Sequence, residues 1–71
     1  MEEEFYRNLG IALKEERKRR NIKQPEIAEK LGVTVAMISY WESGSRQMNA
    51  KELKLFCKAL GVPVQSIIDR T

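Results

Sequence analysis

The chain alternates between short stretches of helical apolar spacing and residues that can end a helix. Asn21, Gly32, Gly44 and Gly61 recur along 71 residues, and each interval leaves room for one short helix. Asparagine and glycine tolerate the left-handed backbone that commonly terminates an α-helix. No segment alternates apolar and polar residues as a half-buried strand does. This punctuation predicts a set of short helices and no sheet.

Apolar spacing assigns an inner face to each expected helix. Phe5, Leu9 and Leu13 recur every four residues, which predicts a first helix over about residues 3–20 with Arg17 continuing its inner face. Further helices are expected to begin near Pro25, Thr34, Asn49 and Pro63 and to end near Gly32, Gly44, Gly61 and the C-terminus. Their expected buried residues are Ile27, Ala28, Leu31, Ile38, Trp41, Leu53, Phe56, Cys57 and Leu60.

Local capping signals support these boundaries. Thr34 is a good N-cap, and Asn49 followed by Glu52 resembles a capping box. Lys23 precedes the second helix, where its amine cannot accept a backbone N–H, so that cap is expected to be weaker. The fold class is therefore predicted to be all-α, a compact five-helix bundle forming one domain over residues 1–71.

Composition excludes several classes of function. The chain has no histidine and one cysteine, Cys57, so zinc binding, an internal disulfide and imidazole catalysis are not expected. No run of 18 apolar residues could span a membrane, and the acidic start "MEEEFYR" differs from a signal peptide. We therefore expect a cytoplasmic protein that is not an enzyme and has no cofactor or metal.

Charge is distributed unevenly along the sequence. The net charge is +3 and the pI about 9.2, which favours an anionic partner only mildly. Between Gly32 and Ser45 the only charged residue is Glu42, and basic residues stand on both sides of that stretch. These flanking residues are Lys14, Arg17, Lys18, Arg19, Arg20, Lys23, Arg46, Lys51 and Lys54.

The segment "QPEIAEKLGVTVAMISYWES", residues 24–43, resembles the helix-turn-helix of the phage repressor/Cro-like (XRE) family. Its leading Gln, small Ala28, turn Gly32 and apolar spacing all match that motif. The motif's ending "ISYWESG" and the downstream segment "LKLFCKALGVPVQSII" also resemble that family, so the resemblance covers about residues 9–69. It implies a lambda-repressor-like fold that binds double-stranded DNA, with a recognition helix over about residues 34–43 in the major groove.

The resemblance also assigns roles to individual residues. Val35, Ala36, Ser39 and Tyr40 match base-reading positions, and Gln24, Ser43 and Arg46 match phosphate positions. With Lys23 and Thr34 at the starts of the two helices, the expected DNA-binding set is Lys23, Gln24, Thr34, Val35, Ala36, Ser39, Tyr40, Ser43 and Arg46. The acidic "EEE" stands where some relatives carry a basic arm, so arm wrapping around DNA is not expected.

An ion pair between Arg17 and Glu42 is expected on two grounds. The family pairs residues at these positions, and the residues themselves favour it. Arg17 faces the bundle, and Glu42 ends a helix whose dipole disfavours a carboxylate there. A homodimer is also expected through Val64, Ile67 and Ile68, since these are many apolar side chains for a short terminal segment.

Several structural interpretations stay open. Tyr40, Val35 and Ala36 can equally be exposed side chains with no partner, Gln24 can simply start a helix, and Met37 suits either packing or groove contact. The run from Lys14 to Arg20 is typical of a solvated helix face.

Function is also open among three classes. The leading hypothesis is a transcription regulator that represses from a palindromic operator. The alternatives are the antitoxin of a toxin–antitoxin pair, which has a small protein partner, and a protein-interaction module of the same fold.

Overall fold

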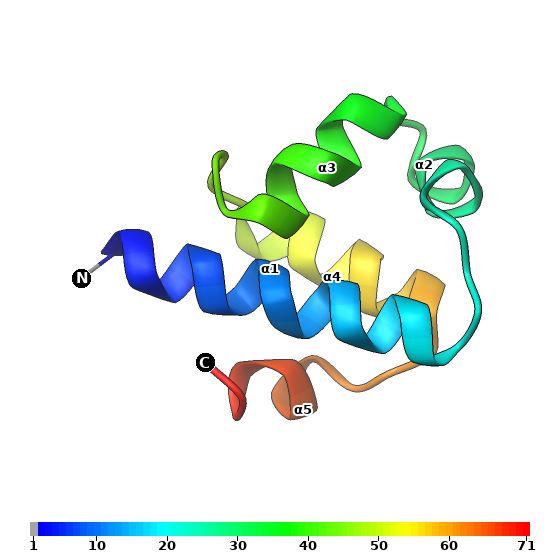
Figure 1. Cartoon of the computed structure of the whole chain (residues 1–71). Helices are drawn as coiled ribbons and strands as arrows, with labels where there is room; N and C mark the ends of the chain where they lie inside the picture. The colour runs from blue at the N-terminus through cyan, green and yellow to red at the C-terminus, as the bar shows by residue number, and fades with distance from the viewer. Residues whose placement is uncertain (1) are drawn as a thin grey trace.

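The computed structural model describes residues 2–71, and within them it contains α-helices and no strands. Figure 1 shows α3 crossing above α1, with α2 beside the start of α3 and α5 on the opposite side of α1. The helices are α1 (Glu2–Arg19), α2 (Gln24–Leu31), α3 (Val35–Ser43), α4 (Ala50–Leu60) and α5 (Val64–Ile68). The predicted all-α architecture of five helices is confirmed.

The chain turns where the sequence indicated. Asn21 has a φ of +57°, the left-handed conformation that asparagine tolerates better than most residues. This residue ends α1 and directs Ile22 back toward the core. Gly32 has a φ of +69° and ends α2, and its N–H bonds the carbonyl of Glu29. The sharp connection from α2 to α3 therefore favours glycine, which has no β-carbon to clash in the left-handed conformation.

The predicted caps are present where the side chains can accept a hydrogen bond. The Thr34 hydroxyl accepts the N–H of Met37 at 3.1 Å. Asn49 and Glu52 form a complete capping box, with Asn49 Oδ1 accepting the Glu52 N–H at 2.8 Å. Lys23, at the N-cap of α2, makes no side-chain cap bond among the described residues, as its chemistry predicts. Pro25 compensates in part because its missing N–H needs no acceptor there.

The core draws on every helix. Leu13, Ile27, Ile38, Phe56 and Ile67 are each less than 2% exposed. The Trp41 ring meets the Phe56 ring edge-on at a centroid distance of 6.3 Å, which joins α3 to α4. Met37, left undecided by the sequence, is half-buried and packs against this core.

Two expectations about apolar residues are wrong. Phe5 is 37% exposed, because the first turns of α1 extend past the other helices (Figure 1), and its ring meets that of Tyr6 edge-on. Ile67 is 1% exposed and belongs to the core, so it has no surface to offer a second subunit. Val64 and Ile68 are partly buried against the same core.

The crossing of α1 and α3 depends on a glycine inside α1. A β-carbon built at Gly10 would lie 2.5 Å from the carbonyl oxygen of Glu42 and would also overlap that of Trp41. Both obstacles are backbone atoms, which cannot rotate away. Gly10 thus sets how closely α1 approaches the end of α3, and that approach brings Arg17 within reach of Glu42.

Candidate nucleic-acid interface

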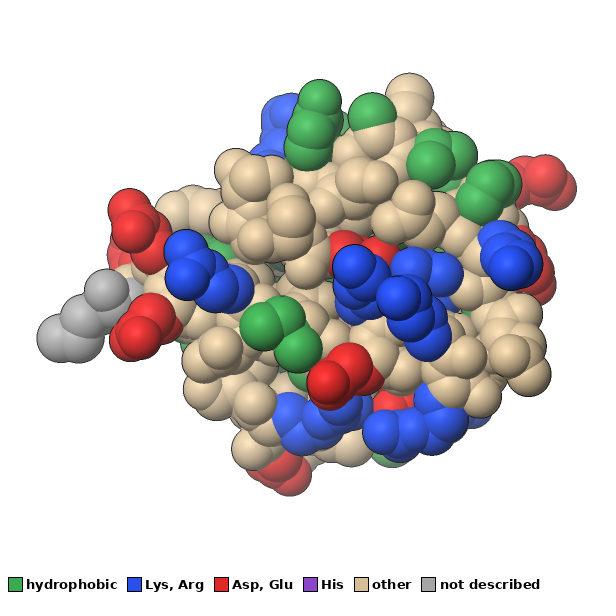
Figure 2. All heavy atoms as spheres, viewed as in Figure 1, with side chains coloured by type: hydrophobic (Ala, Val, Ile, Leu, Met, Phe, Trp, Pro, Cys, Tyr) green, Lys and Arg blue, Asp and Glu red, His purple; other side chains and the backbone are tan. Residues whose placement is uncertain are grey.

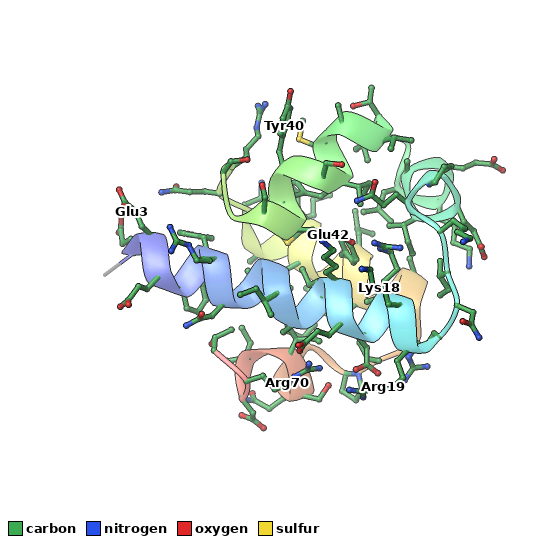
Figure 3. The ribbon with its side chains drawn as sticks, viewed as in Figure 1. Glu3, Lys18, Arg19, Tyr40, Glu42 and Arg70 are labelled. Carbon is green, nitrogen blue, oxygen red and sulfur yellow. The ribbon has the colours of Figure 1, made fainter. Side chains whose placement is uncertain are left out.

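Helix α3 has an uncharged outer face. Val35 is 40% exposed and Tyr40 49% exposed, whereas Ile38 and Trp41 on the inner face are 0% and 4% exposed. Ala36 is also exposed. Tyr40 points away from the rest of the bundle in Figure 3. The helix therefore presents a methyl-bearing and aromatic surface, which is able to contact thymine methyl groups and sugar edges.

The predicted ion pair of Arg17 and Glu42 is present and buried. Arg17 Nε donates to Glu42 Oε2 at 2.6 Å, and Arg17 NH2 donates to Oε1 at 3.0 Å. A third guanidinium nitrogen, NH1, donates to the carbonyl of Ile22 at 2.7 Å. The two residues are 6% and 4% exposed, and Figure 3 shows Glu42 between α3 and α1. This bidentate geometry fixes the end of α3 against α1.

Gln24 and Ser39 extend this pair into a network across three helices. Gln24 Nε2 donates to Glu42 Oε1 at 3.0 Å, and the Ser39 hydroxyl donates to Gln24 Oε1 at 3.2 Å. Both side chains are half-buried. The structure thus brings these two expected contact residues together and uses their polar groups internally. They hold the start of α2 against the middle of α3.

The end of α3 forms a polar recess. The Ser43 and Ser45 hydroxyls are 2.9 Å apart, and both donate to the Tyr40 carbonyl, at 3.2 and 3.3 Å. A hollow of about 410 Å³ opens beside them, lined by Glu3, Tyr6, Arg7, Ser43, Gly44, Ser45 and Gln47. Arg46 is exposed just past it, and its backbone N–H donates to the Tyr40 carbonyl.

A second, basic hollow lies at the turn between α1 and α2. It measures about 190 Å³ and is lined by Arg17, Lys18, Asn21, Ile22 and Lys23. Lys18 and Lys23 are exposed, so their ammonium groups can reach an anion there. In Figure 2, Lys and Arg side chains gather in front of α1, and the surface above them over α3 is mostly uncharged.

Sequence reasoning missed part of this surface. Arg7 lies against the backbone of Gly44 in the first hollow, and Ser45 completes the hydroxyl pair. The available signal was Gly10, since a glycine in a helix interior costs about 1 kcal/mol relative to alanine and so indicates a close approach. That approach brings the neighbouring turn of α1, with Arg7, to the exit of α3.

A separate ionic cluster ties the C-terminal turn to α1. Glu16, only 7% exposed, accepts hydrogen bonds from Arg19, Arg20 and Arg70 at 3.0, 3.2 and 3.1 Å. Arg70 also reaches Glu15 at 2.6 Å, and Figure 3 shows Arg19 and Arg70 below α1. Burial alone raises the pKa of the Glu16 carboxyl, but these guanidinium groups outweigh it and hold the pKa below its ordinary value of 4.5.

The single cysteine is part of the core. Burial raises the pKa of the Cys57 thiol, which is 1% exposed in the core. Among residues 2–71, no group of three or more carboxylates or thiols lies close enough to hold a metal ion. Within the same residues, every helix is too short or too polar to cross a membrane.

Helices α2 and α3 are joined by a sharp turn at Gly32, and α3 presents an exposed outer face. This arrangement defines a helix-turn-helix protein. A helix-turn-helix family model matches residues 13–67, and the chain belongs to this XRE-type, Cro-like family. A solved structure with the same fold is that of the clp gene regulator ClgR from C. glutamicum. The two are 27% identical with a TM-score of 0.90, over 93% of this chain and 86% of that one. No curated protein matches the sequence.

Proposed function

We propose that the protein is a sequence-specific DNA-binding transcription regulator that inserts α3 into the major groove. The observation that carries the proposal is the exposed, uncharged outer face of α3, with exposed basic side chains on the neighbouring segments. Base edges are read in the groove, while phosphates are held by separate groups, so a neutral reading helix is compatible with DNA binding. The likeness to ClgR, a gene regulator by its title, supports the same conclusion.

The proposed division of labour follows the geometry. Val35, Ala36 and Tyr40 read the groove, with Val35 against a thymine methyl group and the Tyr40 hydroxyl as a donor. Lys23 at the start of α2, and Ser43 and Arg46 at the end of α3, hold phosphates. Gln24 can join them through the second hydrogen of its Nε2, since the first is donated to Glu42. Thr34, the N-cap of α3, and Ser39, within α3, contact DNA at the margins of this surface. Ser39 and Gln24 act as a bonded pair, so each positions the other.

We further propose that the regulator is a homodimer that represses from a palindromic operator. Val64 and Ile68, partly buried and at the C-terminal end, remain the candidates for an isologous contact once Ile67 is assigned to the core. Two recognition helices would then lie about 34 Å apart, one turn of DNA. Sedimentation at tens of micromolar, with and without DNA, tests this; a protein that stays monomeric in both conditions contradicts it.

Selection of bound fragments from genomic DNA, followed by binding curves at several salt concentrations, tests the DNA-binding proposal. Val35→Ala or Tyr40→Ala is expected to cost roughly 1–3 kcal/mol on the selected site and much less on unrelated DNA. Arg46→Ala is expected to weaken binding to all sequences similarly and to reduce the salt slope by about one. The opposite pattern would mean that a different helix enters the groove.

A further inference from the structure

A groove between α2 and α4 has an apolar floor and a basic rim. Helices α2 and α4 pack against each other, and two hollows of about 280 Å³ each are lined by residues of both helices. Leu31 and Leu55 line both hollows, so the two lie next to each other, and together they are called the α2–α4 groove. Ala59 adds to the apolar floor at one end.

Leu55 is the central feature of this groove. It is 43% exposed although it lies in the middle of α4, next in sequence to the fully buried Phe56. Leu31 and Ala59 are half-buried on either side of the same hollow. A single exposed leucine is ordinary, but apolar side chains on both walls of one groove form a surface that a partner can cover.

The charges around the groove select the kind of partner. Lys30, Lys51 and Lys58 line it and are exposed. The one acidic residue in the lining, Glu52, is half-buried and has a carboxylate oxygen engaged in the Asn49 cap at 2.9 Å. An occupant therefore gains by bringing carboxylates to the lysines and an apolar side chain to Leu31 and Leu55.

We propose that this groove binds an acidic amphipathic helix of a partner protein. The helix would place an apolar stripe at i, i+3/i+4 and i+7 between α2 and α4, with Asp or Glu beside Lys30 and Lys58. A second copy of this chain fits poorly, because an isologous contact would set the same lysines against one another. Duplex DNA would pair with the lysines but would not cover the apolar side chains of Leu31 and Leu55.

Selection from a displayed library of helical peptides about 16 residues long tests the chemistry of the occupant. Wild-type protein is the bait, and Leu55→Glu protein is the counter-selection. The expected winners carry two or three apolar residues at helical spacing flanked by Asp and Glu. Winners without acidic enrichment, or winners that bind the Leu55→Glu protein equally well, overturn the proposal.

Matched variants then locate the site. Leu55→Glu and Lys58→Glu are each expected to weaken the best acidic peptide by about tenfold or more. Ile11→Glu, which changes a residue of similar exposure (46%) on α1, is expected to leave peptide binding unchanged. Amide shifts in the labelled full chain should map to Leu31, Leu55 and Ala59. Shifts there on self-association or on adding duplex DNA, instead of the peptide, overturn the proposal.

The two proposals fail separately. Neither Leu55 nor Lys58 belongs to the proposed DNA-binding surface, so both variants are expected to retain binding to the DNA fragments selected by the wild-type protein. Loss of DNA binding in a Leu55→Glu protein that unfolds at the wild-type temperature would show that the groove is part of the DNA interface, and this outcome overturns the partner proposal. Failure of Tyr40→Ala to alter sequence preference contradicts only the DNA-reading role.

Discussion

Removing the Glu42 carboxylate is expected to have the largest effect of any single polar change in this domain. In Glu42→Ala, Arg17 loses both of its carboxylate bonds, at 2.6 and 3.0 Å, and keeps only the Ile22 carbonyl. Arg17 is only 6% exposed in the folded domain, so its guanidinium would be left buried without a carboxylate partner. Gln24 also loses its acceptor on α3.

The structure sets the magnitude of this effect. Breaking a buried ion pair from one side costs about 3–5 kcal/mol, because the remaining charge is left uncompensated. A chain of 71 residues has a free energy of unfolding of roughly 4–10 kcal/mol. Since each kcal/mol shifts the Tm of such a small domain by about 4–8 °C, the Tm is expected to fall by roughly 12–40 °C.

Urea unfolding followed by circular dichroism measures the loss, and a second glutamate provides the control. Glu15 pairs with Arg70 at 2.6 Å but is 59% exposed on its side chain, so Glu15→Ala is expected to cost at most about 1 kcal/mol. Replacing both members of the buried pair, as in Arg17→Met with Glu42→Leu, is expected to recover much of the loss. A Glu42→Ala protein no less stable than Glu15→Ala would refute the reasoning.

Two further changes test the packing and the charge cluster. Gly10→Ala, which would stabilise an ordinary helix by about 1 kcal/mol, is expected to destabilise this one by about 1–3 kcal/mol or more in thermal unfolding, because the new carbon meets the Glu42 carbonyl. Glu16 has a lowered folded pKa, so its contribution is present above 4.5 and is lost as pH falls through the folded value. Glu16→Gln is therefore expected to lower stability at pH 7 and to flatten the decline below pH 4.5, measured as urea midpoints against pH; an unchanged profile contradicts this.

Features encoded by short sequence intervals could be predicted. Helix ends at Asn21, Gly32 and Gly44 depend on backbone conformations that only a few residue types tolerate, and the caps at Thr34 and Asn49 depend on side chains next to their own backbone. Such signals lie in a residue and its immediate neighbours, so they can be recognised before the arrangement of the helices is known. The Arg17–Glu42 pair was also predictable, because helical phase points Arg17 inward, Glu42 ends a helix whose dipole disfavours it, and the family resemblance pairs these positions.

Features that depend on how far one helix extends past another could not be predicted. Phe5 has the spacing of a core residue, but it lies beyond the part of α1 that the other helices cover. Ile67 was expected at a subunit contact, and only the position of α5 under α1 shows that it fills the core. For the same reason the Ser39–Gln24 hydrogen bond could not be predicted, since the two residues come from different helices whose crossing the sequence does not give.

The Glu42 network also bears on why α3 carries no basic residue. Glu42 is the only charge on α3, and an exposed carboxylate there would repel phosphates on the proposed DNA face. Its pairing with Arg17 and its 4% exposure neutralise it, and the same contact fixes α3 against α1 and α2. In the proposed DNA-binding role, a lysine or arginine on the outer face of α3 would add affinity for every DNA sequence alike. A neutral α3 leaves that general attraction to the neighbouring segments, so contacts within the groove contribute mainly to the difference between sequences.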